Sequence, residues 1–193
     1  QDGHYQDRMM IMQRKGLASP VVALAAMLIL LPLRPTAASS RDDLLRIAPD
    51  GAVSGWSVVP DSTAYVRGNG LTEIYNGGYE AYTRAGVVDA LRRLYMQGDE
   101  YMEVTVHGMK SPGSAKDFLA DRYKMETGKN APGRADWDRF TAARPGGTTA
   151  YAAAGPFFIT VVSYSGGDKG KTQTEIFLLA LDAKAKQLLK KAK

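Results

Sequence analysis

The residues best suited to binding chemistry lie in one short segment of the sequence, LTEIYNGGYEAY, from Leu71 to Tyr82. Aromatic, amide and carboxylate side chains surround a pair of adjacent glycines there. Tyrosine combines a large apolar ring with a polar hydroxyl, so it is common on binding surfaces. We predict that these side chains form the rim of a ligand-binding site: Tyr75, Asn76, Tyr79, Glu80 and Tyr82.

A hydrolase or lyase is the alternative function, and it would draw on these acidic and basic side chains: Glu80, His107, Asp136 and Asp138. They lie on separate predicted elements, so nothing in the sequence places them within hydrogen-bond reach of one another. His107 is the only histidine after the N-terminal segment, and a lone histidine rarely binds zinc. We expect it to be solvated or hydrogen-bonded on the polar side of a strand. The sequence therefore predicts no metal site, assigns no catalytic residue and favours a protein that is not an enzyme.

A nucleotide-binding motif is nearly present in SGGDKGKT, from Ser165 to Thr172. Gly170, Lys171 and Thr172 fit the end of a phosphate-binding loop, but serine stands where its first glycine belongs. Only one helix follows, whereas that fold needs several later strands. We predict no nucleotide and no other cofactor here, and we expect Thr172 to cap the last helix.

The charge of the chain argues against nucleic acid as a partner. From Ser39 onward there are 21 basic and 18 acidic residues, and five of the lysines lie in the last ten positions. Nucleic-acid binding favours a basic face on the body of the protein, whereas lysines at a helix C-terminus complement its dipole. The absence of cysteine excludes disulfides and thiolate chemistry.

A secretory signal peptide is predicted near the N-terminus. Arg14 and Lys15 precede an apolar stretch from 17 to 33, and small residues lead to Ala38 and Ser39. This order is typical of a signal peptide. We expect export to the periplasm or the cell exterior, with cleavage near Ala38. The alternative is an uncleaved anchor, which would be the only membrane contact, since a spanning helix needs about 20 residues.

Two parts of the sequence follow from that prediction. Residues 1–38 comprise the signal peptide and upstream residues, of which the first nine resemble read-through ahead of the start. Residues 39–193 form a single α+β domain with a long loop near 127–147, containing at most one helical turn at 136–140.

Two hairpins and two helices are readable in that domain. Runs 87–96 and 99–109 are joined at Gln97-Gly98, and runs 148–154 and 156–165 turn at Gly155-Pro156. One helix follows Ser111 as its N-cap, and the last helix is expected to open with Thr172 and Glu175 in capping-box spacing. Paired strands followed by helices predict an antiparallel sheet packed against helices on one face, with the other face free to contact water.

The adjacent glycines are predicted to be structural. A helix from 71 to 85, or a helix with a brief break, would place Gly78 on a buried stripe with Ile74 and Tyr82. Gly77 would then lie nearer the solvent. The competing structure is a tight hairpin turn at Asn76-Gly77, with a positive φ at the glycine.

The segment from Trp56 to Tyr164 resembles an exported bacterial family, domain of unknown function 6599. The resemblance rests on a segment similar to Tyr-x-Asn-Gly-Gly-x-Glu-x-Tyr, with Tyr75, Asn76, Gly77, Gly78, Glu80 and Tyr82 in this chain, and on Met109, Ser111, Pro112 and Ala115 after a strand. One departure is that Tyr75 stands directly before Asn76, where the family often has isoleucine. It implies an exported α+β domain without a known activity. We therefore expect an exported binding or envelope-associated protein whose partner is a small molecule or an envelope protein.

Overall fold

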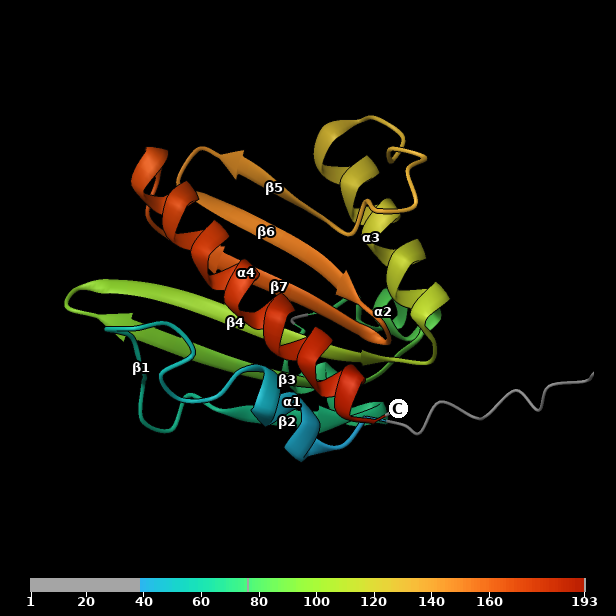
Figure 1. Cartoon of the computed structure of the whole chain (residues 1–193), viewed down its shortest axis with the longest axis horizontal. Helices are drawn as coiled ribbons and strands as arrows, with labels where there is room; N and C mark the ends of the chain where they lie inside the picture. Colours follow the sequence, from blue (N-terminus) through green and yellow to red (C-terminus); the bar gives the residue numbers. More distant parts are fainter. Residues whose placement is uncertain (1–38, 76, 193) are drawn as a thin grey trace, which may run out of the picture. The chain divides into compact units, whose positions relative to one another are not determined.

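The computed structural model describes residues 39–75 and 77–192, all of which belong to one compact unit, Pro35–Lys193. Seven described strands form one antiparallel sheet in the order β1-β3-β4-β7-β6-β5, and β2 also pairs with β3 (Figure 1). Their bounds are Ser57–Val58 (β1), Ala64–Arg67 (β2), Val87–Gln97 (β3), Glu100–Met109 (β4), Arg139–Arg144 (β5), Gly147–Ala154 (β6) and Phe157–Ser163 (β7). The predicted α+β class is thus confirmed.

Both predicted hairpins are present. In the first, Gln97 pairs with Glu100 across a two-residue turn, and in the second Ala154 pairs with Phe157. Gly98 has a φ of 57° and Gly155 a φ of 55°. Glycine reaches this left-handed region without the steric cost that a Cβ brings, so it permits such tight turns.

The helices are α1 (Arg41–Ile47), the short 3-10 helix η1 (Gly68–Glu73), α2 (Tyr79–Ala85), α3 (Pro112–Thr127) and α4 (Gly167–Lys191). Ser111 caps α3 as predicted, because its hydroxyl accepts from the Ser114 amide at 3.0 Å. The predicted cap at Thr172 is wrong, since α4 already begins at Gly167 and Thr172 lies within it. Asp168 in the first turn favours this earlier start through its interaction with the helix dipole.

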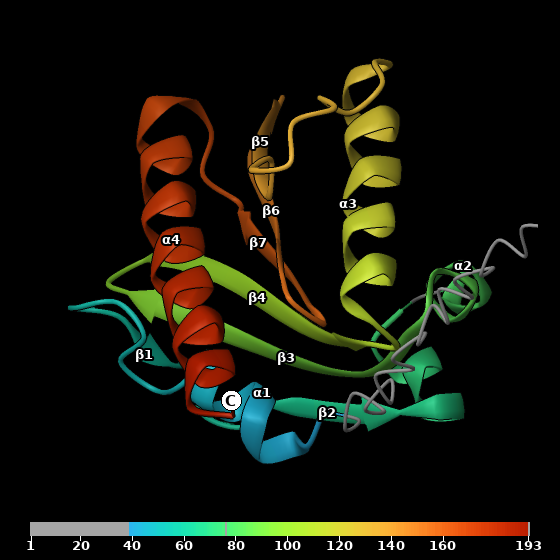
Figure 2. The same ribbon diagram turned by 45° about the vertical axis from the view of Figure 1, so that its right-hand side comes forward.

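Helices cover both faces of the sheet, not one as predicted (Figure 2). On β6, Ala150 and Ala152 belong to the core beneath α4, whereas Tyr151 and Ala153 belong to the core beneath α3. Adjacent residues of β6 therefore face opposite cores, and the second side of the sheet is apolar enough to receive another helix. Full burial of one large side chain, such as Phe177 on α4, stabilises the fold by about 1.5–3 kcal/mol.

The predicted long loop 127–147 contains the edge strand β5, and the helical turn expected at 136–140 is not formed. Phe140 on β5 stacks on Tyr151 of β6 with ring centroids 4.8 Å apart. Cross-strand aromatic pairs stabilise a sheet, and this pairing was not visible in a segment rich in Gly, Pro and charge. Trp137, just before the strand, packs edge-on against Tyr123 at 5.5 Å and anchors the remaining loop.

Among the described residues, no helix combines the length and apolarity required to cross a bilayer.

Candidate binding site

The segment from Leu71 to Tyr82 is two helices joined by a break. η1 ends at Glu73 and α2 begins at Tyr79, while Gly77 and Gly78 have φ values of 80° and 73°. A continuous helix is therefore wrong, and the predicted form with a brief break is the one observed. The positive φ at Gly77 matches the turn alternative, although the turn joins helices and not strands.

The predicted inward position of Gly78 is also wrong. Gly78 is exposed, and a Cβ built on it would meet no atom within 4 Å. The same is true of Gly77. The stripe was drawn for a continuous helix, and a break in helical φ and ψ resets the direction in which later side chains point. These glycines serve the backbone turn and not close packing on the sheet.

The rings of Tyr75, just after η1, and Tyr82, on α2, pack against each other. They stack with centroids 3.7 Å apart and planes inclined by 14°, and each centroid lies 6.0 Å from that of His107 on β4. Tyr79 is half-buried beside them, whereas Glu80 is exposed. Asn76 lies outside the described residues.

Helix α3 completes this cluster, which we call the aromatic site: Tyr75, Tyr82, His107, Phe118 and Arg122. Phe118 meets the Tyr82 ring edge-on at 5.5 Å. The Arg122 guanidinium lies 4.9 Å from the centroid of Tyr82 and 4.8 Å from that of Phe118. A cation at this distance is attracted by the electron-rich face of the ring.

The sequence prediction missed Phe118 and Arg122 as site residues. They are four positions apart on α3, a spacing that places both on one face of a helix. Which element this face of α3 would meet is not a property of the helix itself.

His107 is buried and hydrogen-bonded, so of the two expected states the hydrogen-bonded one is observed and the solvated one is not. Only 2% of it is exposed, because α3 and the η1–α2 segment cover this face of the sheet. Its Nδ1 lies 3.0 Å from the carbonyl oxygen of Phe158. A carbonyl can only accept, so Nδ1 carries the proton and Nε2 of the neutral ring is an acceptor. Burial lowers the pKa of His107 to about 4, and the positive charge of Arg122 acts in the same direction.

Two polar atoms of the aromatic site are buried without a hydrogen-bond partner among the described residues. They are the hydroxyl of Tyr75 and Nε2 of His107. Burial raises the pKa of the Tyr75 hydroxyl, and Tyr82 adds to the increase, so the hydroxyl keeps its proton. A buried polar group without a partner costs about 1–3 kcal/mol of stability. The aromatic site therefore contains one acceptor and one hydroxyl without partners among the described residues, and each lowers the stability of the protein by about this amount.

The groups of the alternative enzymatic hypothesis are dispersed. Glu80 is exposed and His107 is buried, and no described hydrogen bond or ion pair joins them. Asp136 is paired with Arg134 at 3.7 Å. Asp138 accepts from Lys186 at 2.7 Å, in a network that ties β5 to α4. No group of three or more His, Asp or Glu side chains among the described residues is arranged to hold a metal ion.

The phosphate-loop-like segment is occupied by its own contacts. The backbone carbonyl of Ser165 packs against Gly170, and the Ser165 hydroxyl donates to the carboxylate of Glu100. Lys169 binds the same carboxylate at 2.6 Å. A carboxylate at this position repels phosphate, and this repulsion is a physical reason to expect no nucleotide at this segment.

The comparisons with known proteins identify no family for this chain. No family model matches it, and no curated protein matches it. Among solved structures, it is similar to the extracellular domain of PknH from Mycobacterium tuberculosis. The identity is 13% and the TM-score 0.40, and the match covers 80% of this chain and 93% of that one.

Proposed function

We propose that this protein is an exported, non-enzymatic domain that binds a small molecule or an envelope component at the aromatic site. The observation that carries the proposal is the pair of buried, unpartnered polar atoms, Tyr75 Oη and His107 Nε2, on rings that lie side by side. Buried polar atoms are nearly always hydrogen-bonded, so each exception calls for a partner.

The chemistry of these atoms indicates what the ligand must present. His107 Nε2 can only accept, so the ligand needs an N–H or O–H donor there. The Tyr75 hydroxyl can donate to an oxygen of the same ligand. A small molecule bearing hydroxyl and amide groups, such as an acetylated amino sugar of a bacterial envelope, meets both requirements.

Binding is better supported than catalysis. A general base works best when its pKa lies near the working pH, and the pKa of His107 is about 4. No described serine, threonine or carboxylate is hydrogen-bonded to its Nε2. A neutral imidazole of low basicity is suited to accepting a hydrogen bond from a ligand.

Export and processing are part of the proposal. The basic start, the apolar stretch and the small residues before Ser39 support a signal peptide cleaved after Ala38. N-terminal sequencing of the exported protein tests this, and a chain retained in the membrane with its N-terminus intact would favour the anchor. We also propose membership of the family known as domain of unknown function 6599, on the Tyr75–Tyr82 and Met109–Ala115 motifs.

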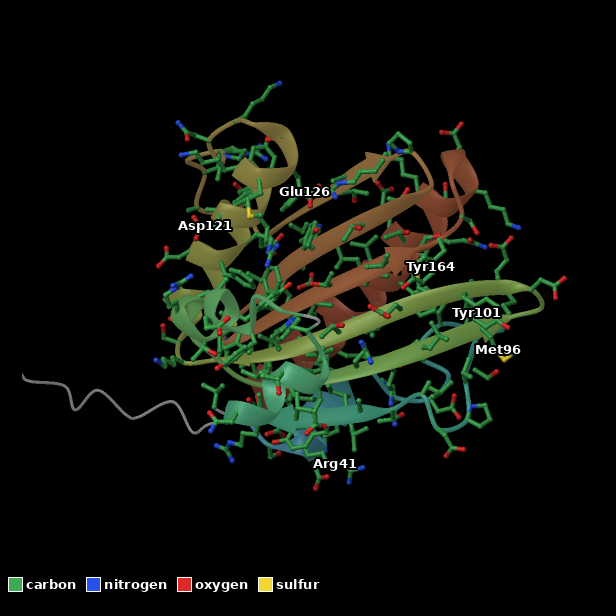
Figure 3. All side chains as sticks on the ribbon, turned by 180° about the vertical axis from the view of Figure 1, so that it is seen from behind. Arg41, Met96, Tyr101, Asp121, Glu126 and Tyr164 are labelled. Carbon is green, nitrogen blue, oxygen red and sulfur yellow. The ribbon has the colours of Figure 1, made fainter. Side chains whose placement is uncertain are left out.

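The binding experiment uses N-acetylglucosamine as the probe and the side-chain nitrogen resonances of His107 as the readout. We expect titration to shift the Nε2 resonance, because a new donor alters an unprotonated ring nitrogen. Tyr75→Phe should weaken the response, while Tyr164→Phe should leave it unchanged. Tyr164 is the control because it contacts Glu103 toward the other end of β4, away from α2 (Figure 3). A resonance that does not move at any soluble sugar concentration would refute an amino sugar as the ligand.

A further inference from the structure

A buried carboxylate lies outside the aromatic site, on β3. Asp89 is 0% exposed, in the middle of an otherwise apolar run of the strand. Its Oδ1 accepts from the hydroxyl of Ser39 at 2.6 Å, and its Oδ2 accepts from the hydroxyl of Tyr65 at 3.1 Å. The backbone of Gly108 on the neighbouring strand supplies a further hydrogen bond.

The backbone around Asp89 is shaped to admit Ser39. The register between β3 and β4 shifts between Val87 and Asp89, as happens at a β-bulge that re-aims a side chain. Gly108 lies opposite the shift, and a Cβ there would collide with both the Ser39 side chain and the Asp89 carboxylate. A glycine inside a strand marks a close approach of this kind.

Asp89 has no ion-pair partner among the described residues. No described Lys or Arg lies within 4.0 Å of it, although Arg67 on β2 attracts it from farther away. Burial raises the pKa of Asp89, and the bonds from Ser39, Tyr65 and the Gly108 backbone oppose the increase. A buried carboxylate held only by neutral donors is costly and gains most from a nearby cation.

Ser39 is also the residue that cleavage after Ala38 would make the first of the mature chain. We propose that signal-peptide cleavage creates the missing cation, and that the α-ammonium of Ser39 pairs with the buried carboxylate of Asp89. This inference rests on the proposed export and deepens it, because it makes the processed N-terminus part of the folded core.

The covalent step is ordinary peptide hydrolysis by a signal peptidase. The C–N bond between Ala38 and Ser39 breaks, and the hydroxyl of water adds to the Ala38 carbonyl carbon. One proton from water goes to the Ser39 nitrogen, and the proton of the new carboxyl group completes the ammonium. Before cleavage the same nitrogen is a neutral amide and provides no charge.

The distance suits an ion pair. The nitrogen of a serine lies about 3 Å from its own hydroxyl oxygen. The Ser39 hydroxyl donates a hydrogen bond to Asp89 at 2.6 Å, so the Ser39 nitrogen lies within about 6 Å of the carboxylate. Opposite charges stabilise each other in this range. α1 begins two residues later with Ser40 as its N-cap, which holds Ser39 in this position.

The consequence is that processing and folding are coupled. The exported chain gains this ion pair only when it starts at Ser39. Any extension or neutral cap at Ser39 would leave Asp89 without its cation.

The test compares residues 39–193 with a free Ser39 amine against the same chain acetylated at Ser39, each with Asp89 and with Asp89→Asn. We expect acetylation to lower the Tm by at least about 3 °C when Asp89 is present and by less than about 1 °C in Asp89→Asn. The α-amine of the free chain should titrate at least about one pH unit above its ordinary value of about 7.7. Equal Tm values for the free and acetylated chains, together with an ordinary amine titration, would overturn the ion pair. If Asp89→Asn does not fold, the amine titration of the Asp89 chain decides alone.

Sequencing of the exported protein separates this inference from the proposal beneath it. A mature chain that begins at Ser39 supports both. A chain that is cleaved elsewhere confirms export and overturns the ion pair as a product of processing. Binding of the sugar is measured independently and is unaffected by either result.

Discussion

Replacing Tyr75 with phenylalanine should make the unliganded protein more stable. The substitution removes one hydroxyl from a buried position where it has no partner among the described residues, and it leaves the ring stacked on Tyr82. Burying a hydroxyl without a hydrogen bond costs about 1–3 kcal/mol, so its removal should raise the free energy of unfolding by about that amount. A gain of this size raises the Tm of a domain of this length by about 2–4 °C for each kcal/mol.

The experiment has two internal controls. Tyr95 donates to the carbonyl oxygen of Pro49 at 2.8 Å, so Tyr95→Phe should lower the free energy of unfolding by about 1 kcal/mol. Tyr82→Phe, on the partner ring of the stack, should change it by less than about 0.5 kcal/mol. Urea unfolding followed by tryptophan fluorescence measures all three, with equal m values required for the comparison.

The sign of the change in the free energy of unfolding in Tyr75→Phe shows whether the Tyr75 hydroxyl has a partner. If this substitution destabilises the protein as much as Tyr95→Phe does, the hydroxyl has a partner in solution, and the case for a free ligand contact fails. If it stabilises the protein and also weakens the response to N-acetylglucosamine, the hydroxyl is retained for binding at the expense of stability.

Three further predictions test other parts of the structure. The pKa of His107 is about 6.5 in the unfolded chain and about 4 in the folded protein. Its contribution to stability is therefore intact above pH 6.5 and falls by about 3 kcal/mol toward pH 4. When the free energy of unfolding of residues 39–193 is measured against pH, this dependence should disappear in His107→Gln. Gly77→Ala should cost about 1–2 kcal/mol because φ is 80° there, whereas Gly133→Ala, with open space and no positive φ, should be neutral or mildly stabilising in the same urea assay. Gly108→Ala should cost about 1–3 kcal/mol by displacing Ser39 from Asp89, and an unchanged urea midpoint would show that the two side chains move aside freely.

The local elements could be read from the chain because their causes are local. Gly98 and Gly155 supply turns, alternation identifies the strands on either side, and Ser111 with Pro112 starts α3. β5 was misread because its cause is not local. A Gly- and charge-rich stretch becomes a strand when Phe140 finds Tyr151 on a neighbour, and that neighbour is specified elsewhere in the chain.

The same distinction between local and long-range causes applies to the candidate site. The sequence by itself determined that Tyr75 and Tyr82 lie in one segment around two glycines, that His107 lies within a predicted strand, and that a stretch typical of a signal peptide precedes Ser39. Only the tertiary structure decided that His107 is buried, because helix α3, which carries Arg122, packs over the polar side of its strand. It also decided that Ser39 reaches Asp89, 50 residues away, through a bulge and a glycine on adjacent strands. Periodicity and capping act within a few residues, whereas burial and long-range pairing depend on which surfaces meet when the whole chain packs.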